Sequence, residues 1–459
     1  MNIHCIRPAA LAGVLFCLGA FVSAAAAPPG FSDPRATGPY AVGFSYFVFH
    51  DPSRGDRPIP VHVWYPADPA DVTMGVGRAS YPVDPPDLTL PSSPSTYWEA
   101  YGIEPAYDEP PVSGDGPFPL VMFSPGWGAT AWDHVAMAAR VASHGFVVAI
   151  PYHWGDRAFF NTEPIDHITL ALKNRPLDLS FMLDNLLERN ATVGDLFHDA
   201  IDPSAVAASG WSLGGYAAMV LAGGDDQVCD TYEAFEPPPP PPPPPESCVT
   251  SWPDPRVKAI VTLDGSTQYL HFYELARISV PTLGIGEEWD HLKETLEING
   301  QSFATWQARL HAATGGQPAY RVDIGGGANH DNFSDLCEAS QVFGDMGLLD
   351  PGFVDILVGA FCSAEIPTSL ATELESMYMI AFLKTNLVHE AGYQSYLTPG
   401  YALKEPYVEF FRTEKRNPRA IHDDWPGEFT YFPHQPGNAM GHAEMDPATI
   451  EVPIRHAGL

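Results

Sequence analysis

The chain has 459 residues, 23 of them basic and 56 acidic, and its formal net charge is −33. Such a surface repels phosphate backbones and anionic headgroups, so neither a nucleic acid nor an anionic membrane is expected as a partner. Hydrophobic residues make up 45 % of the chain, which is enough for a large core and excludes an intrinsically disordered protein.

Residues 1–27 predict a signal peptide. Arg7 precedes an apolar run of 14 residues, 9–22, and small residues follow up to Ala27. Exported proteins carry charged, apolar and cleavage regions in this order, and the run is too short to span a bilayer. A buried N-terminal helix is the alternative. We therefore expect a secreted or periplasmic chain without stable membrane insertion.

Four cysteines follow the predicted signal peptide: Cys229, Cys248, Cys337 and Cys362. Export would place them in an oxidising compartment, where three pairings are possible. We expect the local pairing, 229–248 and 337–362. No CxxC motif occurs and neither spacing resembles a zinc knuckle, so we expect no metal and no cofactor.

Apolar, β-branched segments alternate with helical patterns, which predicts an α/β fold with a mostly parallel sheet. Several of the segments are continuously apolar, as expected of strands covered by helices on both faces. The predicted strands are 61–65, 120–124, 146–151, 205–210, 259–263, 282–286 and 320–324. Helices are predicted over 132–144, from Pro176 onward, and around 370–381.

Two insertions, about 223–255 and about 337–366, interrupt the predicted domain, which covers residues 35–395. The first insertion contains nine consecutive prolines, 237–245, which predict a stiff polyproline II rod. A solvated spacer is the favoured interpretation of this rod, and a docking ligand is the alternative. Residues 396–459 form an extension whose fold the sequence does not predict.

The sequence Gly210-Trp-Ser-Leu-Gly-Gly215 carries the strongest chemical signal. It follows the predicted strand 205–210 and precedes a helical pattern, which is the strand–turn–helix context of a nucleophile elbow. Glycines are needed there because a Cβ beside the serine would clash with the neighbouring strand or helix. We therefore expect Ser212 to be a nucleophile that needs a base.

The expected base is His330. It ends the glycine-rich loop that follows the last predicted strand, and His271, His291 and the histidines of the extension lack this context. Two acids remain possible. Asp264 ends the segment KAIVTLD, and Asp290 lies in the loop after the next strand, near Glu287 and Glu288. The order Ser…Asp…His fits an α/β-hydrolase with either acid.

An oxyanion hole is expected from two backbone N–H groups. Leu213 follows the nucleophile at the start of the helix, and Trp127 lies between two glycines after the predicted strand 120–124. Trp127 and Trp211 are also candidates for the apolar walls of an acyl pocket, although core packing beside the elbow explains Trp211 equally well.

Several of these segments together resemble the platelet-activating-factor acetylhydrolase group of α/β-hydrolases and their dienelactone-hydrolase-like bacterial relatives. The resemblance covers about residues 40–390 and includes PLVMFSPGWG, NRPLDLSFMLDNLL, GWSLGGYAA, VKAIVTLDGS and GANHDNFSD. In that group the triad acid follows the strand after the nucleophile helix, which implies Asp264 rather than Asp290. The group's oxyanion donors correspond to Trp127 and Leu213. Dienelactone hydrolases use a cysteine nucleophile, so Ser212 argues against their substrate.

The expected function is therefore that of an exported serine ester hydrolase that works through Ser212, His330 and Asp264. Short-acyl phospholipids, which would imply lipid degradation, small esters and polyesters are all open as substrates. A non-catalytic binding module with the same fold and an amidase with the same triad are the alternatives. The sequence does not predict the oligomeric state.

Overall fold

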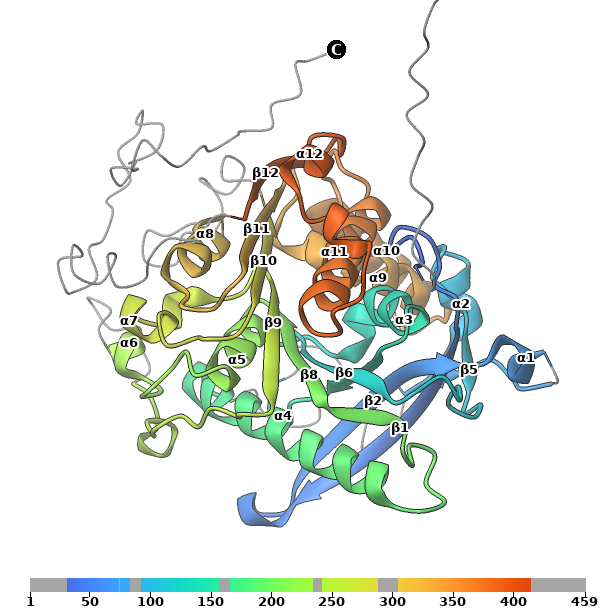
Figure 1. The fold of residues 1–459 in the computed structure, drawn as a ribbon, viewed down its shortest axis with the longest axis horizontal. Helices are drawn as coiled ribbons and strands as arrows, with labels where there is room; N and C mark the ends of the chain where they lie inside the picture. The colour runs from blue at the N-terminus through green and yellow to red at the C-terminus, as the bar shows by residue number, and fades with distance from the viewer. Residues whose placement is uncertain are drawn as a thin grey trace, which may run out of the picture.

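The computed structural model describes residues 31–73, 75–82, 92–156, 166–233, 242–287 and 304–413. Its centre is a ten-stranded sheet with the order β12-β11-β10-β9-β8-β6-β7-β2-β1-β5 (Figure 1). The strands are β1 (Ala41–Asp51), β2 (Arg57–Ala67), β5 (Ala106–Asp108), β6 (Phe118–Ser124), β7 (Val147–Pro151), β8 (Ile201–Trp211), β9 (Val257–Leu263), β10 (Thr282–Glu287), β11 (Ala319–Ile324) and β12 (Val408–Arg412). A separate small sheet pairs β3 (Ser80–Tyr81) with β4 (Ser93–Pro94).

The central strands of the large sheet, from β11 to β7 in spatial order, run parallel to one another. Antiparallel pairs flank them, with β2 against β7, β1 against β2, and β12 against β11. Strand β6 is buried along its whole length, as expected where helices cover both faces. The predicted α/β fold with a mostly parallel sheet is confirmed.

Helices cover both faces of the sheet (Figure 1). They are α1 (Pro69–Val72), α2 (Ser95–Glu99), α3 (Val135–Ser143), α4 (Ile168–Ala191), α5 (Leu213–Leu221), α6 (Asp230–Glu233), α7 (Phe272–Leu275), α8 (Ala304–Ala313), α9 (Leu336–Asp345), α10 (Pro351–Phe361), α11 (Thr368–Asn386) and α12 (Pro399–Ala402). Alternate strand residues enter two cores, so Val121 packs with α3 and α11 while its neighbour Leu120 packs with α4 and α5. None of the described helices is both long and apolar enough to cross a bilayer.

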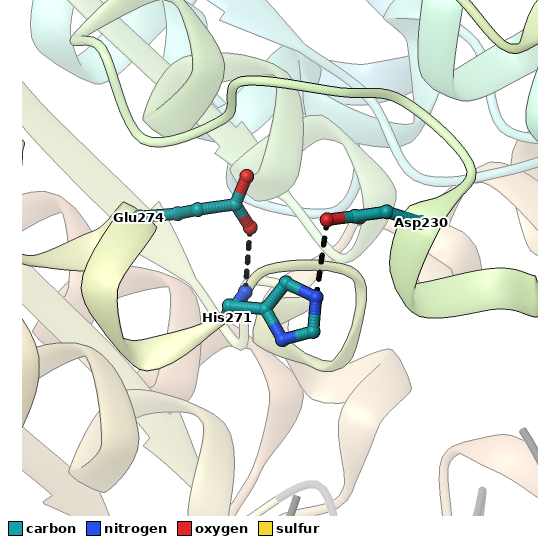
Figure 2. A group of neighbouring side chains, drawn as sticks. All are labelled: Asp230, His271 and Glu274. Atoms are coloured by element: carbon teal, nitrogen blue, oxygen red, sulfur yellow. Dashed lines mark hydrogen bonds and ion pairs between the residues drawn. The ribbon is translucent and has the colours of Figure 1, made fainter. Parts of the chain in front are cut away.

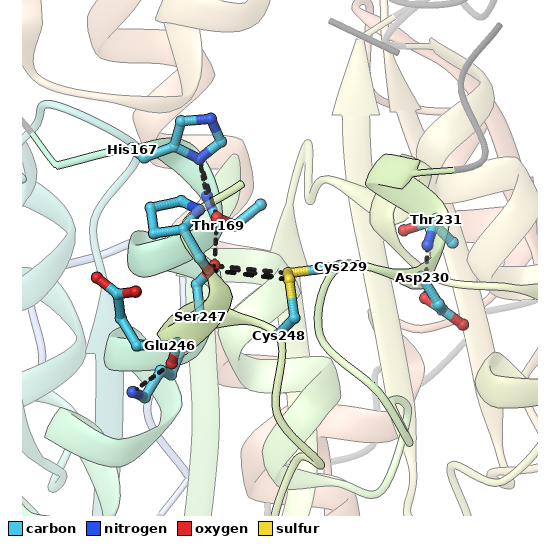
Figure 3. The surroundings of a disulfide bond; sticks show 10 residues. His167, Thr169, Cys229, Asp230, Thr231, Glu246, Ser247 and Cys248 are labelled. Atoms are coloured by element: carbon cyan, nitrogen blue, oxygen red, sulfur yellow. Dashed lines mark hydrogen bonds between the residues drawn. A yellow bond between two sulfur atoms is a disulfide. The ribbon is translucent and has the colours of Figure 1, made fainter. Parts of the chain in front are cut away.

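The cysteines pair locally, as expected from the sequence. Cys229 is bonded to Cys248 across the first insertion (Figure 3), and Cys337 in α9 is bonded to Cys362 just after α10. The first bridge lies beside Ser247, whose hydroxyl is 2.7 Å from the Thr169 hydroxyl near the start of α4. The bridge thus closes the insertion on itself, and this hydrogen bond connects it to helix α4. The predicted signal peptide and most of the proline run lie outside the described residues.

Helix α4 begins earlier than the sequence suggests. The sequence pattern predicts that Pro176 opens it, but the helix starts at Ile168 and contains Pro176 in its interior. The side chain of His167 caps the helix by accepting a hydrogen bond from the Thr169 N–H. A capped first turn lets the helix start there although proline removes one backbone donor further along.

The predicted end of the domain near residue 395 is too early. Strand β12 lies beyond that point and pairs with β11, and its residues Val408 and Phe411 are buried. Strands β1 and β5 are also absent from the predicted set. All three lie outside the repeating strand–helix pattern, since β1 and β12 join the sheet through antiparallel pairing and β5 pairs along only three residues.

Candidate active site

Ser212 lies at the sharp turn between β8 and α5. Its backbone adopts φ 55° and ψ −122°, a conformation that L-residues rarely occupy. The glycines that follow it are required by close contacts. A Cβ on Gly214 would lie 1.8 Å from the Ser124 carbonyl oxygen, and a Cβ on Gly215 would lie 2.5 Å from the Gly265 Cα. This is the packing reason that the motif predicts for its glycines.

Asp264 and His330 lie at the same edge of the sheet as Ser212, because β8, β9 and β11 are parallel strands that end there. His330 Nδ1 is 2.6 Å from Asp264 Oδ2, and the Asp264 carboxylate is fully buried. The Ser212 N–H donates to the Leu263 carbonyl, and the Ser212 carbonyl accepts from the Ser266 N–H. Backbone hydrogen bonds thus join the elbow to the turn that carries Asp264.

Two tryptophans hold the His330 ring. The Trp211 ring stacks on it with a centroid distance of 4.8 Å, and Trp306 meets it edge-on at 6.0 Å. The Trp211 indole N–H also donates to the His330 carbonyl at 3.0 Å. Trp211 is only 7 % exposed, so it packs beside the elbow and fixes the imidazole. Trp127, in contrast, is 51 % exposed and can offer an apolar wall.

Neither expected oxyanion donor is engaged elsewhere. In the part of the chain that the structure describes, no acceptor pairs with the backbone N–H of Trp127 or Leu213. Leu213 is the first residue of α5, where N–H groups are left free by the helix and the helix dipole favours negative charge.

The sequence did not assign a role to Glu287, which ends β10 beside Asp264. Both carboxyl groups are fully buried, and burial raises the pKa of each. The pKa of Glu287 is raised further by the negative charge of Asp264, whereas the hydrogen bond from His330 favours the ionised form of Asp264. Of the two carboxyl groups, Glu287 therefore favours its protonated form more strongly than Asp264 does. The sequence signal that could have identified Glu287 is its position at the end of the strand that follows Asp264. The other candidate acid, Asp290, lies outside the described residues.

Among the described residues, two overlapping groups have the residue types of a cation site, and both include Glu274. One is Asp230, His271 and Glu274 (Figure 2), and the other adds Asp225 and Asp226 to Glu274. Their atoms are already satisfied, since His271 Nε2 is 3.0 Å from Asp230 and Glu274 accepts the backbone N–H groups of His271 and Asp226. Burial also raises the pKa of Glu274 to about 9, which makes it a poor ligand at neutral pH. The arrangement gives no reason to assign a metal.

Two comparisons with known proteins found similar sequences or structures. Residues 100–175 match the family model of platelet-activating factor acetylhydrolase, isoform II. Among solved structures, a ferulic acid esterase from Streptomyces cinnamoneus is similar, with 20 % identity and a TM-score of 0.50 over 78 % of this chain and 92 % of that chain. No curated protein matched the sequence.

The family match includes β6, the candidate oxyanion loop and the first part of α4. The chain has an α/β-hydrolase-like fold, and its residues 100–175 resemble the platelet-activating-factor acetylhydrolases.

Proposed function

We propose that the chain is an exported serine esterase that uses Ser212 as nucleophile, His330 as general base and Asp264 as the acid that orients the imidazole. The observation that carries this proposal is the 2.6 Å contact between His330 and the buried Asp264, at the sheet edge where Ser212 occupies a strained turn. The two disulfides support export, because such bridges persist in oxidising compartments.

The reaction proceeds in two halves. His330 takes the proton of Ser212 Oγ as the oxygen attacks the ester carbonyl, and the N–H groups of Trp127 and Leu213 stabilise the resulting oxyanion. His330 then protonates the leaving alcohol, which departs and leaves an acyl group on Ser212. Water activated by the same histidine attacks the acyl-enzyme and releases the acid. Asp264 stabilises the imidazolium throughout and does not take the proton.

The substrate is an ester of a small or short-chain acid. The family that matches residues 100–175 is named for an acetylhydrolase, and the similar structure is named for an ester of ferulic acid, an aromatic acid. The half-exposed Trp127 beside the oxyanion position suits a flat or apolar acyl group. Short-acyl phospholipids and polyester chains would also present such groups.

The test is turnover of p-nitrophenyl acetate, butyrate, octanoate and palmitate, together with methyl ferulate and matched anilides. We expect hydrolysis of short or aromatic esters and little hydrolysis of anilides. Ser212→Ala should lose at least about 10³-fold in kcat. Asp264→Asn should lose about 10²–10⁴-fold, whereas Asp290→Asn, the matched acid control, should stay close to wild type. Full activity in Asp264→Asn with loss in Asp290→Asn would transfer the acid role to Asp290.

A further inference from the structure

A buried arginine holds the loop that carries the candidate oxyanion donor Trp127. Arg175 of α4 is fully buried, and its guanidinium reaches the loop that follows β6. Its Nη2 donates to the Gly126 carbonyl at 2.6 Å, and its Nη1 donates to the Pro125 carbonyl. Two successive carbonyl groups before Trp127 therefore point at one side chain.

The Gly126 carbonyl matters because it belongs to the same peptide group as the Trp127 N–H. A trans peptide is planar, and its C=O and N–H point in opposite directions. Fixing the carbonyl on Arg175 therefore fixes the direction of the Trp127 N–H toward the other side of the loop. A cationic donor on the carbonyl also polarises the amide, which strengthens the hydrogen bond that its N–H can donate.

Asp156 completes this clamp on the other side of Trp127. Its Oδ2 accepts from Arg175 Nε at 2.6 Å, and its Oδ1 accepts from the Gly128 N–H at 3.0 Å. Asp156 is 1 % exposed, so both charges of the pair are sealed from water. A buried, doubly bonded pair of this kind keeps one geometry, because losing either partner leaves an uncompensated charge.

A second layer supports the arginine. Ser124 Oγ accepts from Arg175 Nη1 at 3.1 Å and is 2.9 Å from His153 Nε2, while His153 Nδ1 is 2.9 Å from Asp178 Oδ2. The order Ser–His–Asp imitates a catalytic triad, but all three residues are buried. Burial lowers the pKa of His153 to about 4, so the ring is neutral and serves as a bridge. Arg57 balances the charge of Asp178 at 2.9 Å.

We propose that Arg175 is a positioning residue of the oxyanion hole, which orients and polarises the Trp127 N–H through the Gly126–Trp127 peptide and is itself held by Asp156. This proposal rests on the proposed function. It predicts a defect confined to states in which the substrate oxygen carries negative charge, since only those states need the oriented donor.

The experiment compares Arg175→Gln and Arg175→Lys with wild type in the full mature chain, on the best p-nitrophenyl ester. We expect kcat to fall about 10- to 100-fold in Arg175→Gln, less than the 10²–10³ typical of deleting a donor, with KM changed less than about threefold. Affinity for a trifluoromethyl ketone, which forms an oxyanion on Ser212, should fall by the same factor as kcat/KM. Affinity for the corresponding secondary alcohol, which forms none, should stay the same. Arg175→Lys should recover part of the loss, because an ammonium can bond one of the two carbonyls.

Arg309→Lys is the matched control. Arg309 is also a buried arginine that donates to two backbone carbonyls, those of Thr267 and Leu270, but it does not touch the oxyanion loop. The Arg309→Lys variant should have a lower melting temperature, but its ratio of ketone affinity to alcohol affinity should equal that of wild type.

Three results separate the possible failures. Unchanged kcat/KM and ketone affinity in a folded Arg175→Gln would overturn the proposal, as would equal losses for ketone and alcohol. If Arg175→Gln does not fold, Asp156→Asn tests the proposal through the same ratio of ketone to alcohol affinity, with an expected loss of about 3- to 30-fold. Retained turnover in Ser212→Ala would instead refute the proposed function.

Discussion

At the scale of single residues, the proposed acid Asp264 is one of a pair of buried carboxyl groups, with Glu287 as the other. Asp264 has one oxygen on His330 and the other without a donor unless Glu287 supplies its proton. Two charged carboxylates cannot share this buried position, so one of the two stays protonated. Glu287 is the protonated member, because burial and the negative charge of Asp264 both raise its pKa. We expect the proton of Glu287 to stabilise the negative charge of Asp264, and that charge in turn orients His330.

Substituting Glu287 tests this arrangement. Glu287→Gln keeps a donor toward Asp264 and should retain kcat within about threefold of wild type. Glu287→Leu removes the donor and leaves a buried oxygen unsatisfied, which costs about 1–3 kcal/mol of folding free energy. The charge on Asp264 then becomes more localised and stabilises the protonated base. The acid limb of the kcat/KM profile should therefore move to higher pH in Glu287→Leu and stay in place in Glu287→Gln. Identical profiles for the two variants would contradict the pairing.

The residues of the candidate site were predictable from sequence to the extent that they follow strands. Ser212, Asp264 and His330 could be named because each lies just after an apolar segment that forms a parallel strand, and such strands end at one edge. Arg175 and Asp156 could not be named, because their role depends on which carbonyls they meet across the fold. Trp211 remained open from sequence for the same reason, since stacking on His330 is a contact between distant segments.

At the scale of elements, the central sheet follows from the apolar pattern, but its edges do not. A strand between two covered faces needs a continuous apolar run, and that run can be read directly. Strand β12 lies at the edge of the sheet and pairs with β11 alone, so it needs fewer apolar residues than a central strand. Its short segment resembles many loop segments that happen to contain aromatic residues, so the domain boundary near residue 395 was placed too early.

Phe411 tests the contribution of β12. Its ring lies 6.4 Å from Tyr320 of β11 and 5.8 Å from Tyr378 of α11, and the residue is 4 % exposed. Phe411→Ala should destabilise the folded hydrolase by about 3 kcal/mol through lost burial and a cavity. Chemical denaturation gives the free energy of unfolding directly, and Tyr407→Ala, a partly buried neighbour, serves as the control with a smaller loss. A change below about 0.5 kcal/mol for Phe411→Ala would mean that β12 adds nothing to the fold.

At the scale of the whole molecule, burial of acidic groups should make stability depend on pH. Burial raises the pKa of Asp133 to about 7 and that of Glu274 to about 9, so the folded chain holds protons that the unfolded chain releases. A raised carboxyl pKa costs stability as pH rises from about 4 to the folded value. Buried histidines act in the opposite sense. Burial lowers the pKa of His62 and His134 to about 3, so the folded protein loses stability as the pH falls below about 6.5. Above that pH, the described groups with raised carboxyl pKa values titrate and these histidines do not, so stability should fall from about pH 6.5 to 9.

Asp133→Asn isolates one of these groups. The amide can still accept the Thr130 N–H that Asp133 binds at 2.7 Å, but it does not titrate. The free energy of unfolding of the variant should increase relative to that of wild type by up to about 1.4 kcal/mol per pH unit between about pH 5 and 7. Above that range the difference should level off. Denaturation of both proteins at pH 5, 6, 7 and 8 provides the comparison, in which the histidine contributions cancel. A difference that is independent of pH would show that Asp133 is ionised in the folded state.

Whether Ser212 is an activated nucleophile can be tested by mass spectrometry of the protein after reaction with a fluorophosphonate. A serine activated by a neighbouring imidazole reacts with such a phosphonyl donor, and ordinary serines do not. We predict one phosphonyl group per chain, on the peptide that contains Ser212, none in Ser212→Ala, and slower labelling in Asp264→Asn. Labelling of a different serine, or the absence of labelling in folded protein that hydrolyses esters, would contradict the account.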